Sequence, residues 1–122
     1  RQEVMVEEGN CASAVGSGLL KVFATPAMIA LMEKTAWMSV APELGEGEGT
    51  VGTLLNVTHD APTPIGMKVW CESTLEEVDG RRLVFSVEAF DEKGRIGGGR
   101  HERFIIGNEK FQAKADRKNA AE

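Results

Sequence analysis

Residues 25–41 read TPAMIALMEKTAWMSVA, and this stretch decides the fold. Thr25 and Pro26 predict the start of a helix, because threonine caps the free amides of a first turn and proline is tolerated at the first helical position. Pro42 and the glycine-rich run 45–49 predict its end near Ala41. Apolar residues occupy nearly all sides, which predicts a helix buried at the centre of the fold. They are Met28, Ile29, Leu31, Met32, Ala36, Trp37 and Val40.

Four extended runs follow the helix, and turn signals separate them. Prolines and a glycine between residues 62 and 66 break the first pair, whereas Asp79-Gly80 and Glu92-Lys93-Gly94 are connections of the hairpin kind. In the middle two runs apolar residues recur at every second position, so one face of an antiparallel sheet should pack against the helix. The predicted strands are residues 51–60, 67–78, 83–91 and 95–107. The alternating residues are Val69, Cys71, Leu75, Leu83, Phe85, Val87 and Ala89.

The remaining segments have weaker signals. Residues 3–7 alternate like an edge strand, and the Gly-, Ser- and Ala-rich residues 9–18 predict a loop or mobile flap. The triplet 97–99 is all glycine and fits a bend or bulge inside the last strand. Residues 108–120 predict a solvated terminal helix or a frayed end. One buried helix, then four strands, with a candidate fifth before it, is an α+β order in which a sheet wraps around a helix, as in the hot-dog fold.

Size and charge limit the classes of protein. The 122 residues, 42% of them hydrophobic, predict one domain over residues 1–122 with a single core. Fourteen basic against nineteen acidic side chains give a net charge of -5, which argues against nucleic acid as a partner. A few local lysines or arginines could still hold the phosphates of coenzyme A.

The cysteines and the hydropathy predict a cytoplasmic protein. Cys11 and Cys71 match no metal or redox spacing, so two reduced thiols are expected, and a disulfide between them stays an alternative. No apolar stretch is long enough for a membrane span, and none resembles a signal peptide. We therefore expect no membrane association and no bound metal.

Glu33 is the most informative single position. Ile29 and Trp37 lie one helical turn away on either side, so the carboxylate is expected on an apolar side of the helix. Burying a carboxylate there is costly unless it is paired, protonated or functional, and burial would suit it to acid, base or nucleophilic chemistry. The alternative is that Glu33 reaches solvent beside Lys34 or forms a buried salt bridge. The sequence leaves both readings open.

Two other side chains could share the chemistry. His59 ends a predicted strand, where it can present an imidazole into a cleft, although His101 offers the same group and composition does not choose between them. Thr25 is expected to cap the helix. A cap also lies at the positive end of the helix dipole, where developing negative charge is stabilised.

Six stretches of the sequence carry a family resemblance. They are VFAT at 22–25, LME at 31–33, EGEGTVGT at 46–53, VTH at 57–59, GRHER at 99–103, and 107–114 with its EKF and AK. In order and spacing they resemble the fluoroacetyl-CoA thioesterase family over residues 22–114. The resemblance implies a hot-dog homodimer that hydrolyses a thioester of coenzyme A. No metal or organic cofactor is implied, since coenzyme A is part of the substrate.

The same resemblance implies roles for individual residues. The family's catalytic threonine, glutamate and histidine fall on Thr25, Glu33 and His59. It further implies that the backbone amide of Gly52 holds the thioester carbonyl and that Arg103 supports the site.

One departure bears on specificity. Where the fluoroacetyl-specific enzyme is expected to carry phenylalanines as a hydrophobic lid, this chain has Gly16 and Leu19 in a Gly/Ser-rich segment. We therefore predict a thioesterase for some other short or medium acyl group. The alternatives are a non-catalytic hot-dog module that binds acyl-CoA or another hydrophobic ligand, and a structural dimerisation domain.

Overall fold

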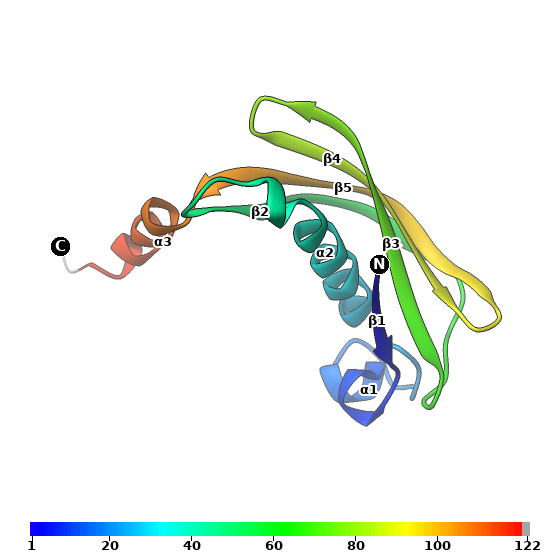
Figure 1. Cartoon of the computed structure of the whole chain (residues 1–122). Coiled ribbons are helices and arrows are strands. Elements are labelled where there is room, and N and C mark those ends of the chain that lie inside the picture. Colours follow the sequence, from blue (N-terminus) through cyan, green and yellow to red (C-terminus); the bar gives the residue numbers. More distant parts are fainter. Residues whose placement is uncertain (121–122) are drawn as a thin grey trace.

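The computed structural model describes residues 1–120 and has one antiparallel sheet that curls around a single long helix (Figure 1). The five strands lie in the order β1-β3-β4-β5-β2, and helix α2 lies against the concave face. The predicted α+β class, with a sheet wrapped around a helix, is confirmed. The elements are β1 (Gln2–Met5), α1 (Ala12–Val15), α2 (Thr25–Val40), β2 (Glu48–His59), β3 (Lys68–Asp79), β4 (Arg82–Asp91), β5 (Gly94–Gly107) and α3 (Asn108–Asp116).

The start of α2 differs from the prediction. Ala24 is the N-cap residue, and Thr25 is the first residue of the helix with no side-chain bond to a backbone amide. The Thr25 hydroxyl bonds instead to the ring of His59. Pro26 has no N–H, so the first turn has one orphan donor fewer to satisfy. The prediction that Thr25 caps the helix is therefore wrong, and its hydroxyl is free for another task.

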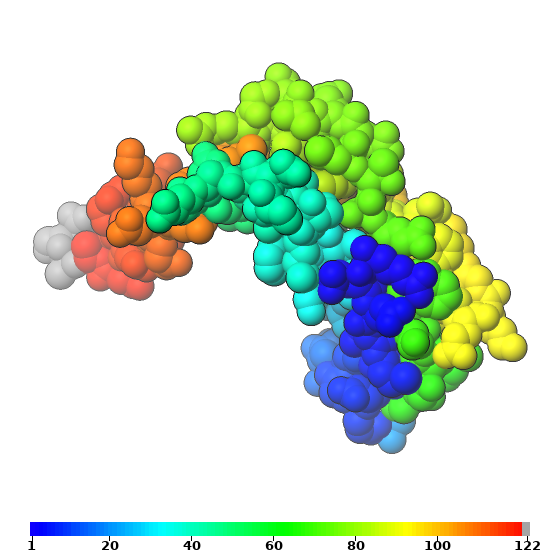
Figure 2. Space-filling view, viewed as in Figure 1, coloured from blue at the N-terminus to red at the C-terminus, as the bar shows by residue number. Residues whose placement is uncertain are grey.

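Helix α2 is buried on one side only. Its inner side packs on the sheet with Met28, Met32 and Ala36 fully buried, and each large apolar side chain contributes roughly 1.5–3 kcal/mol by leaving water. Trp37 on the opposite side is 43% exposed. The prediction of burial on all sides is wrong, because the sheet of one chain curls around only part of the helix. Figure 2 shows the molecule hollowed between the N-terminal segment and α3, with α2 bordering the hollow.

The alternating residues of β3 and β4 face the helix as predicted, with one exception. Val69, Cys71, Leu83, Phe85, Val87 and Ala89 are buried in the core. Leu75 is 43% exposed, because it lies where the long β3–β4 hairpin extends past the helix, next to a break in register before Glu77.

The glycine triplet lies inside β5, as predicted. A register shift leaves Ile96 as the bulged residue immediately before the triplet. A Cβ at Gly97 or Gly99 would collide with a backbone carbonyl of β2, from Thr58 or Asn56 respectively. The glycines thus let β2 approach β5 closely beside the end of β2, where His59 lies.

The N-terminal third contains more structure than the sequence indicated. Strand β1 pairs antiparallel with β3, which confirms the edge strand. The predicted loop 9–18 is partly helical, because the Asn10 side chain accepts a bond from the Glu7 amide and donates one to the Met5 carbonyl, which fixes a 3-10 turn. Helix α1 follows and ends at Gly16 in the left-handed conformation.

Helix α3 and the two cysteines agree with the expectations from the sequence. Helix α3 is exposed along its length, as the prediction of a solvated terminal helix requires. Cys11 and Cys71 are both buried free thiols, so the expected reduced state and not the alternative disulfide is found. Within residues 1–120, no helix combines the length and the hydropathy needed to cross a membrane.

Candidate active site

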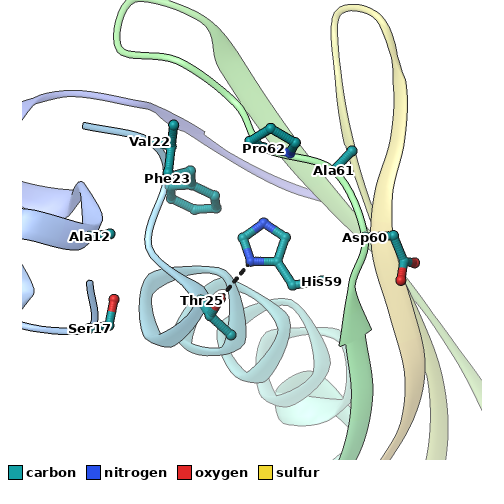
Figure 3. Close-up of a pocket in the computed structure, with 9 residues that line it drawn as sticks. All are labelled: Ala12, Ser17, Val22, Phe23, Thr25, His59, Asp60, Ala61 and Pro62. Carbon is teal, nitrogen blue, oxygen red and sulfur yellow. Dashed lines mark hydrogen bonds between the residues drawn. The ribbon is translucent and has the colours of Figure 1, made fainter. Parts of the chain in front are cut away.

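The first polar cluster joins the start of α2 to the end of β2. The Thr25 Oγ1 and His59 Nδ1 atoms are 2.7 Å apart, within hydrogen-bond distance for either tautomer of the ring. Figure 3 shows the His59 ring turned toward Thr25, with Phe23 and Pro62 beside it. These four residues border a cleft with a volume of about 250 Å³. Its lining residues are Ala12, Ser17, Val22, Phe23, Thr25, His59, Asp60, Ala61 and Pro62.

The electrostatics of His59 suit proton transfer. Burial lowers the pKa of the imidazole, and the neighbouring Asp60 carboxylate opposes this only in part. The ring is therefore neutral near neutral pH. Its second nitrogen, Nε2, is buried and has no hydrogen-bond partner among the described residues. Such an atom costs about 1–3 kcal/mol when unsatisfied, so it favours a ligand that brings a hydrogen-bonding group.

The second cluster lies further along α2. The Glu33 Oε2 atom lies 3.3 Å from Nη1 of Arg103, a side chain that is only 7% exposed. Arg103 also donates from Nε to the Thr50 hydroxyl at 2.8 Å and from Nη2 to the Thr50 carbonyl at 3.0 Å. Burial lowers the pKa of Arg103, and the Glu33 carboxylate opposes the shift. The guanidinium stays charged and is held in a fixed orientation.

Glu33 has the geometry of the second reading of the sequence, in which the carboxylate reaches solvent or forms a salt bridge. It forms an ion pair, and its side chain is also 39% exposed, because it lies on the open side of α2. A pair with one partner this exposed contributes less than about 1 kcal/mol to stability. The fully buried carboxylate that the sequence also allowed is not found in the single chain.

Gly52 makes room for this carboxylate. A Cβ at Gly52 would collide with Glu33 Oε2 and would lie 3.3 Å from both Arg103 Nη1 and His101 Cε1. The register between β2 and β5 shifts between Gly52 and Leu54, so the strand bulges at this point. The glycine therefore serves the site by having no side chain.

The two clusters remain apart within one chain. Thr25 and Glu33 are eight residues apart on a straight helix, which separates their backbones by about 12 Å. The Arg103 cluster borders a separate cleft of about 320 Å³. This second cleft is lined by Trp37, Ala41, Leu44, Glu48, Gly49, Thr50, Arg103 and Asn108.

The structure adds two residues that the sequence reasoning did not assign. Thr50 holds Arg103, and His101 lies against the same guanidinium with Nε2 3.2 Å from Nη1. A signal was available, because His101 and Arg103 are two apart on a strand and therefore point to the same face. In the described part of the chain, no three His, Cys, Asp or Glu side chains are grouped as a metal site would require.

Comparison with known proteins gives these clusters a context. A family model described as fluoroacetyl-CoA-specific thioesterase matches residues 6–109. The fluoroacetyl-CoA thioesterase of Streptantibioticus cattleyicolor is 46% identical over 101 residues, which are 83% of this chain and 73% of that protein. A solved fluoroacetyl-CoA thioesterase matches with a TM-score of 0.92 at 38% identity, over 96% of this chain and 91% of the other. A thioesterase superfamily member from Thermus thermophilus matches with a TM-score of 0.88 at 31% identity, over 97% and 88%.

The fold shared with these structures defines a hot-dog-fold thioesterase, an enzyme that hydrolyses thioesters. The match extends to the family, and the chain belongs to the fluoroacetyl-CoA-specific thioesterase family. The resemblance stated from the sequence motifs is thereby confirmed.

Replacing Gly52 with alanine tests the role of the empty space. We expect Gly52→Ala to lower thioesterase kcat on the order of 100-fold, because displacement of a reacting group by about 1 Å has an effect of that size. The control is Gly107→Ala on β5, where an added Cβ meets nothing within 4 Å. Equal kcat in the two variants, both folded by circular dichroism, would contradict the steric argument.

Proposed function

We propose that this protein hydrolyses an acyl-CoA thioester to the free acid and coenzyme A, with Thr25, Glu33 and His59 as its catalytic residues. The observation that carries the proposal is the arrangement of two polar clusters along one helix, each beside a cleft. Solved relatives support a CoA thioester as substrate, since one holds fluoroacetate and CoA and another holds acetyl-CoA.

The proposed chemistry assigns a separate task to each group. The Glu33 carboxylate either removes a proton from the attacking water, or attacks the carbonyl carbon itself to form an acyl anhydride. In the second case a water molecule then hydrolyses the anhydride, which releases the acid and restores the carboxylate. The Gly52 amide donates to the oxyanion that forms, and the Thr25 hydroxyl orients the substrate. When the carbon–sulfur bond breaks, the departing thiolate takes up a proton that His59 shuttles. The reaction needs no metal or organic cofactor.

We further propose that the active enzyme is a homodimer. Strand β2 lies at an edge of the sheet, and Leu54 and Leu55 on it are 41% and 39% exposed. A long apolar edge is a template for pairing with another strand, and a second copy of the chain would cover it. The open side of α2, with Ile29 and Trp37, would be covered by the same contact.

The dimer would also complete the site. Around a twofold axis, two antiparallel α2 helices bring the first turn of one close to the middle of the other. The Thr25–His59 pair of one chain would then face the Glu33–Arg103 pair of its partner. A thioester lying between the two helices could be reached by both pairs. In a single chain the substrate would have to span the roughly 12 Å between Thr25 and Glu33.

The acyl group is proposed to be short or medium in length and not specifically fluoroacetyl. The cleft beside His59 is lined on its outer side by small residues such as Ala12 and Ser17, and residues 1–22 contain no phenylalanine. Phe23 is the single aromatic residue in its lining. We also propose a cytoplasmic location, which the two free cysteines support.

Replacing the Glu33 carboxylate tests its proposed role as base or nucleophile. We expect Glu33→Gln to lower kcat by about 100-fold to 10,000-fold, the usual contribution of a positioned acid or base. The readout is thiol release over a panel of acyl-CoA esters. Glu43→Gln is the control, since Glu43 is an exposed carboxylate just beyond the same helix. Similar turnover in the two variants would refute the assignment of Glu33 as a catalytic residue. The binding-module alternative predicts a different result, which is no turnover of any acyl-CoA ester by the wild-type protein.

The proposed lack of an aromatic lid can be tested by substrate specificity. Without an aromatic lid to sense the fluorine, kcat/KM should differ by less than about tenfold between fluoroacetyl-CoA and acetyl-CoA. Competition between the two substrates in one reaction measures this ratio directly. A strong preference for the fluorinated substrate would refute the lid argument while leaving the thioesterase activity intact.

A heterodimer of two inactive variants tests the proposed shared site. A heterodimer of one Thr25→Ala chain and one Glu33→Gln chain contains one intact composite site, so we expect about half of the wild-type activity. Two different affinity tags allow the heterodimer to be isolated. The homodimers of each variant should stay inactive. Inactivity of the purified heterodimer as well would mean that each site lies within one chain.

A further inference from the structure

His101 is a fully buried histidine with two hydrogen bonds, one at each ring nitrogen. Nδ1 lies 2.8 Å from the carbonyl oxygen of Leu54, and Nε2 lies 3.2 Å from Nη1 of Arg103. The ring also stacks on Phe85, with centroids 6.1 Å apart. None of these contacts involves the Thr25–His59 pair.

The partners of His101 fix its tautomer. A carbonyl oxygen only accepts hydrogen bonds, so Nδ1 carries the proton and donates it. A guanidinium only donates, so Nε2 has no proton and accepts. Burial lowers the pKa of His101, and the charge of Arg103 acts in the same direction, whereas the Leu54 bond and Glu33 oppose them. The imidazole is therefore neutral and has one defined acceptor.

The bulge in β2 makes this geometry. Gly52 pairs with Arg103 and Leu54 pairs with Glu102, which leaves Thr53 as the extra residue. The same bulge thus places Gly52 against the Glu33 carboxylate and presents the Leu54 carbonyl to His101. The surroundings of the Glu33 carboxylate and of the His101 ring therefore both depend on this one β-bulge.

A single nitrogen of Arg103 links the histidine to the carboxylate. Nη1 has two hydrogens, and it donates to His101 Nε2 and to Glu33 Oε2. Because the guanidinium is planar, the acceptors of Thr50 and His101 together fix its plane, and the plane sets the direction of the N–H that points to Glu33. That N–H then fixes Oε2 of Glu33. The other oxygen, Oε1, has no hydrogen-bond partner within residues 1–120.

We propose that His101 is a positioning residue, which orients Arg103 and through it the Glu33 carboxylate, so that Oε1 is the oxygen available to the reaction. The inference rests on the proposed function of Glu33 and adds the group that aligns it. It also answers which histidine transfers protons. Both nitrogens of His101 are engaged, whereas Nε2 of His59 has no partner among the described residues, so His59 takes the proton-transfer role.

The competing explanation is that His101 only stabilises the bulge. The two roles use different nitrogens, which makes them separable. An asparagine amide reaches the position of Nδ1 and can keep the bond to the Leu54 carbonyl. A glutamine amide reaches the position of Nε2 and can keep an acceptor for Arg103.

The experiment therefore compares His101→Gln with His101→Asn on the best acyl-CoA substrate of the wild-type enzyme. We expect His101→Gln to keep kcat within a few-fold, and His101→Asn to lose about tenfold to a hundredfold in kcat with little change in KM. In an enzyme that already carries Glu33→Gln, His101→Asn should have no further effect on kcat. The opposite order of the two variants, equal activity of both, or an additive loss in the Glu33→Gln background would overturn the proposal.

A measurement on the unmodified enzyme covers the case in which neither variant folds. Nitrogen-15 NMR of the histidine ring distinguishes a protonated Nδ1 with a bare Nε2 from the other tautomer and from the cation. We expect the first form for His101 throughout the pH range of activity. A cationic ring or the other tautomer would overturn the proposal. If the wild-type enzyme turned over no acyl-CoA ester, the proposed function itself would fail, whatever the state of His101.

Discussion

The packing of helix α2 on one face only is the constraint on which the rest of the structure depends. A curled sheet of this size covers the side of the helix that carries Met28 and Met32, and it leaves the side of Glu33 and Trp37 open. Polar groups on the open side keep contact with water, so a carboxylate can lie on a mostly apolar helix without the full cost of burial. The open side is therefore where a carboxylate keeps contact with water, and it is the surface that the proposed second chain would cover.

The ladder between β2 and β5 imposes the second constraint. Alternation along β5 directs His101 and Arg103 to the concave face, and removing a guanidinium from water is costly. Thr50, His101 and Glu33 together supply acceptors for four N–H bonds of Arg103. Such a network is stable only when nearly complete, so its geometry is rigid. Such rigidity suits the catalytic role that we propose for Glu33.

The sequence was sufficient for the fold and for naming most residues of the two polar clusters, and the reason lies in the range of the interactions. Periodicity and turn residues act locally, so the helix and the four long strands could be predicted. The partner of Thr25 could not, because the choice between capping and bonding to His59 depends on a residue 34 positions away. The exposure of Trp37 could not be predicted for the same reason, because hydropathy does not tell how far a sheet extends around a helix.

The two histidines show why environment decides the role of a residue type. Burial lowers the pKa of both His59 and His101, so the protonation equilibrium alone does not distinguish them. The hydrogen bonds of the two rings do distinguish them. A ring with both nitrogens bound is held in one tautomer and cannot exchange a proton without breaking a bond, which suits it to orient a neighbour. A ring with one nitrogen bound to Thr25 and the other buried without a partner in residues 1–120 can exchange a proton with a ligand that reaches it. The hydrogen bonding of the two rings, and not their pKa, therefore distinguishes the supporting role proposed for His101 from the proton-transfer role proposed for His59.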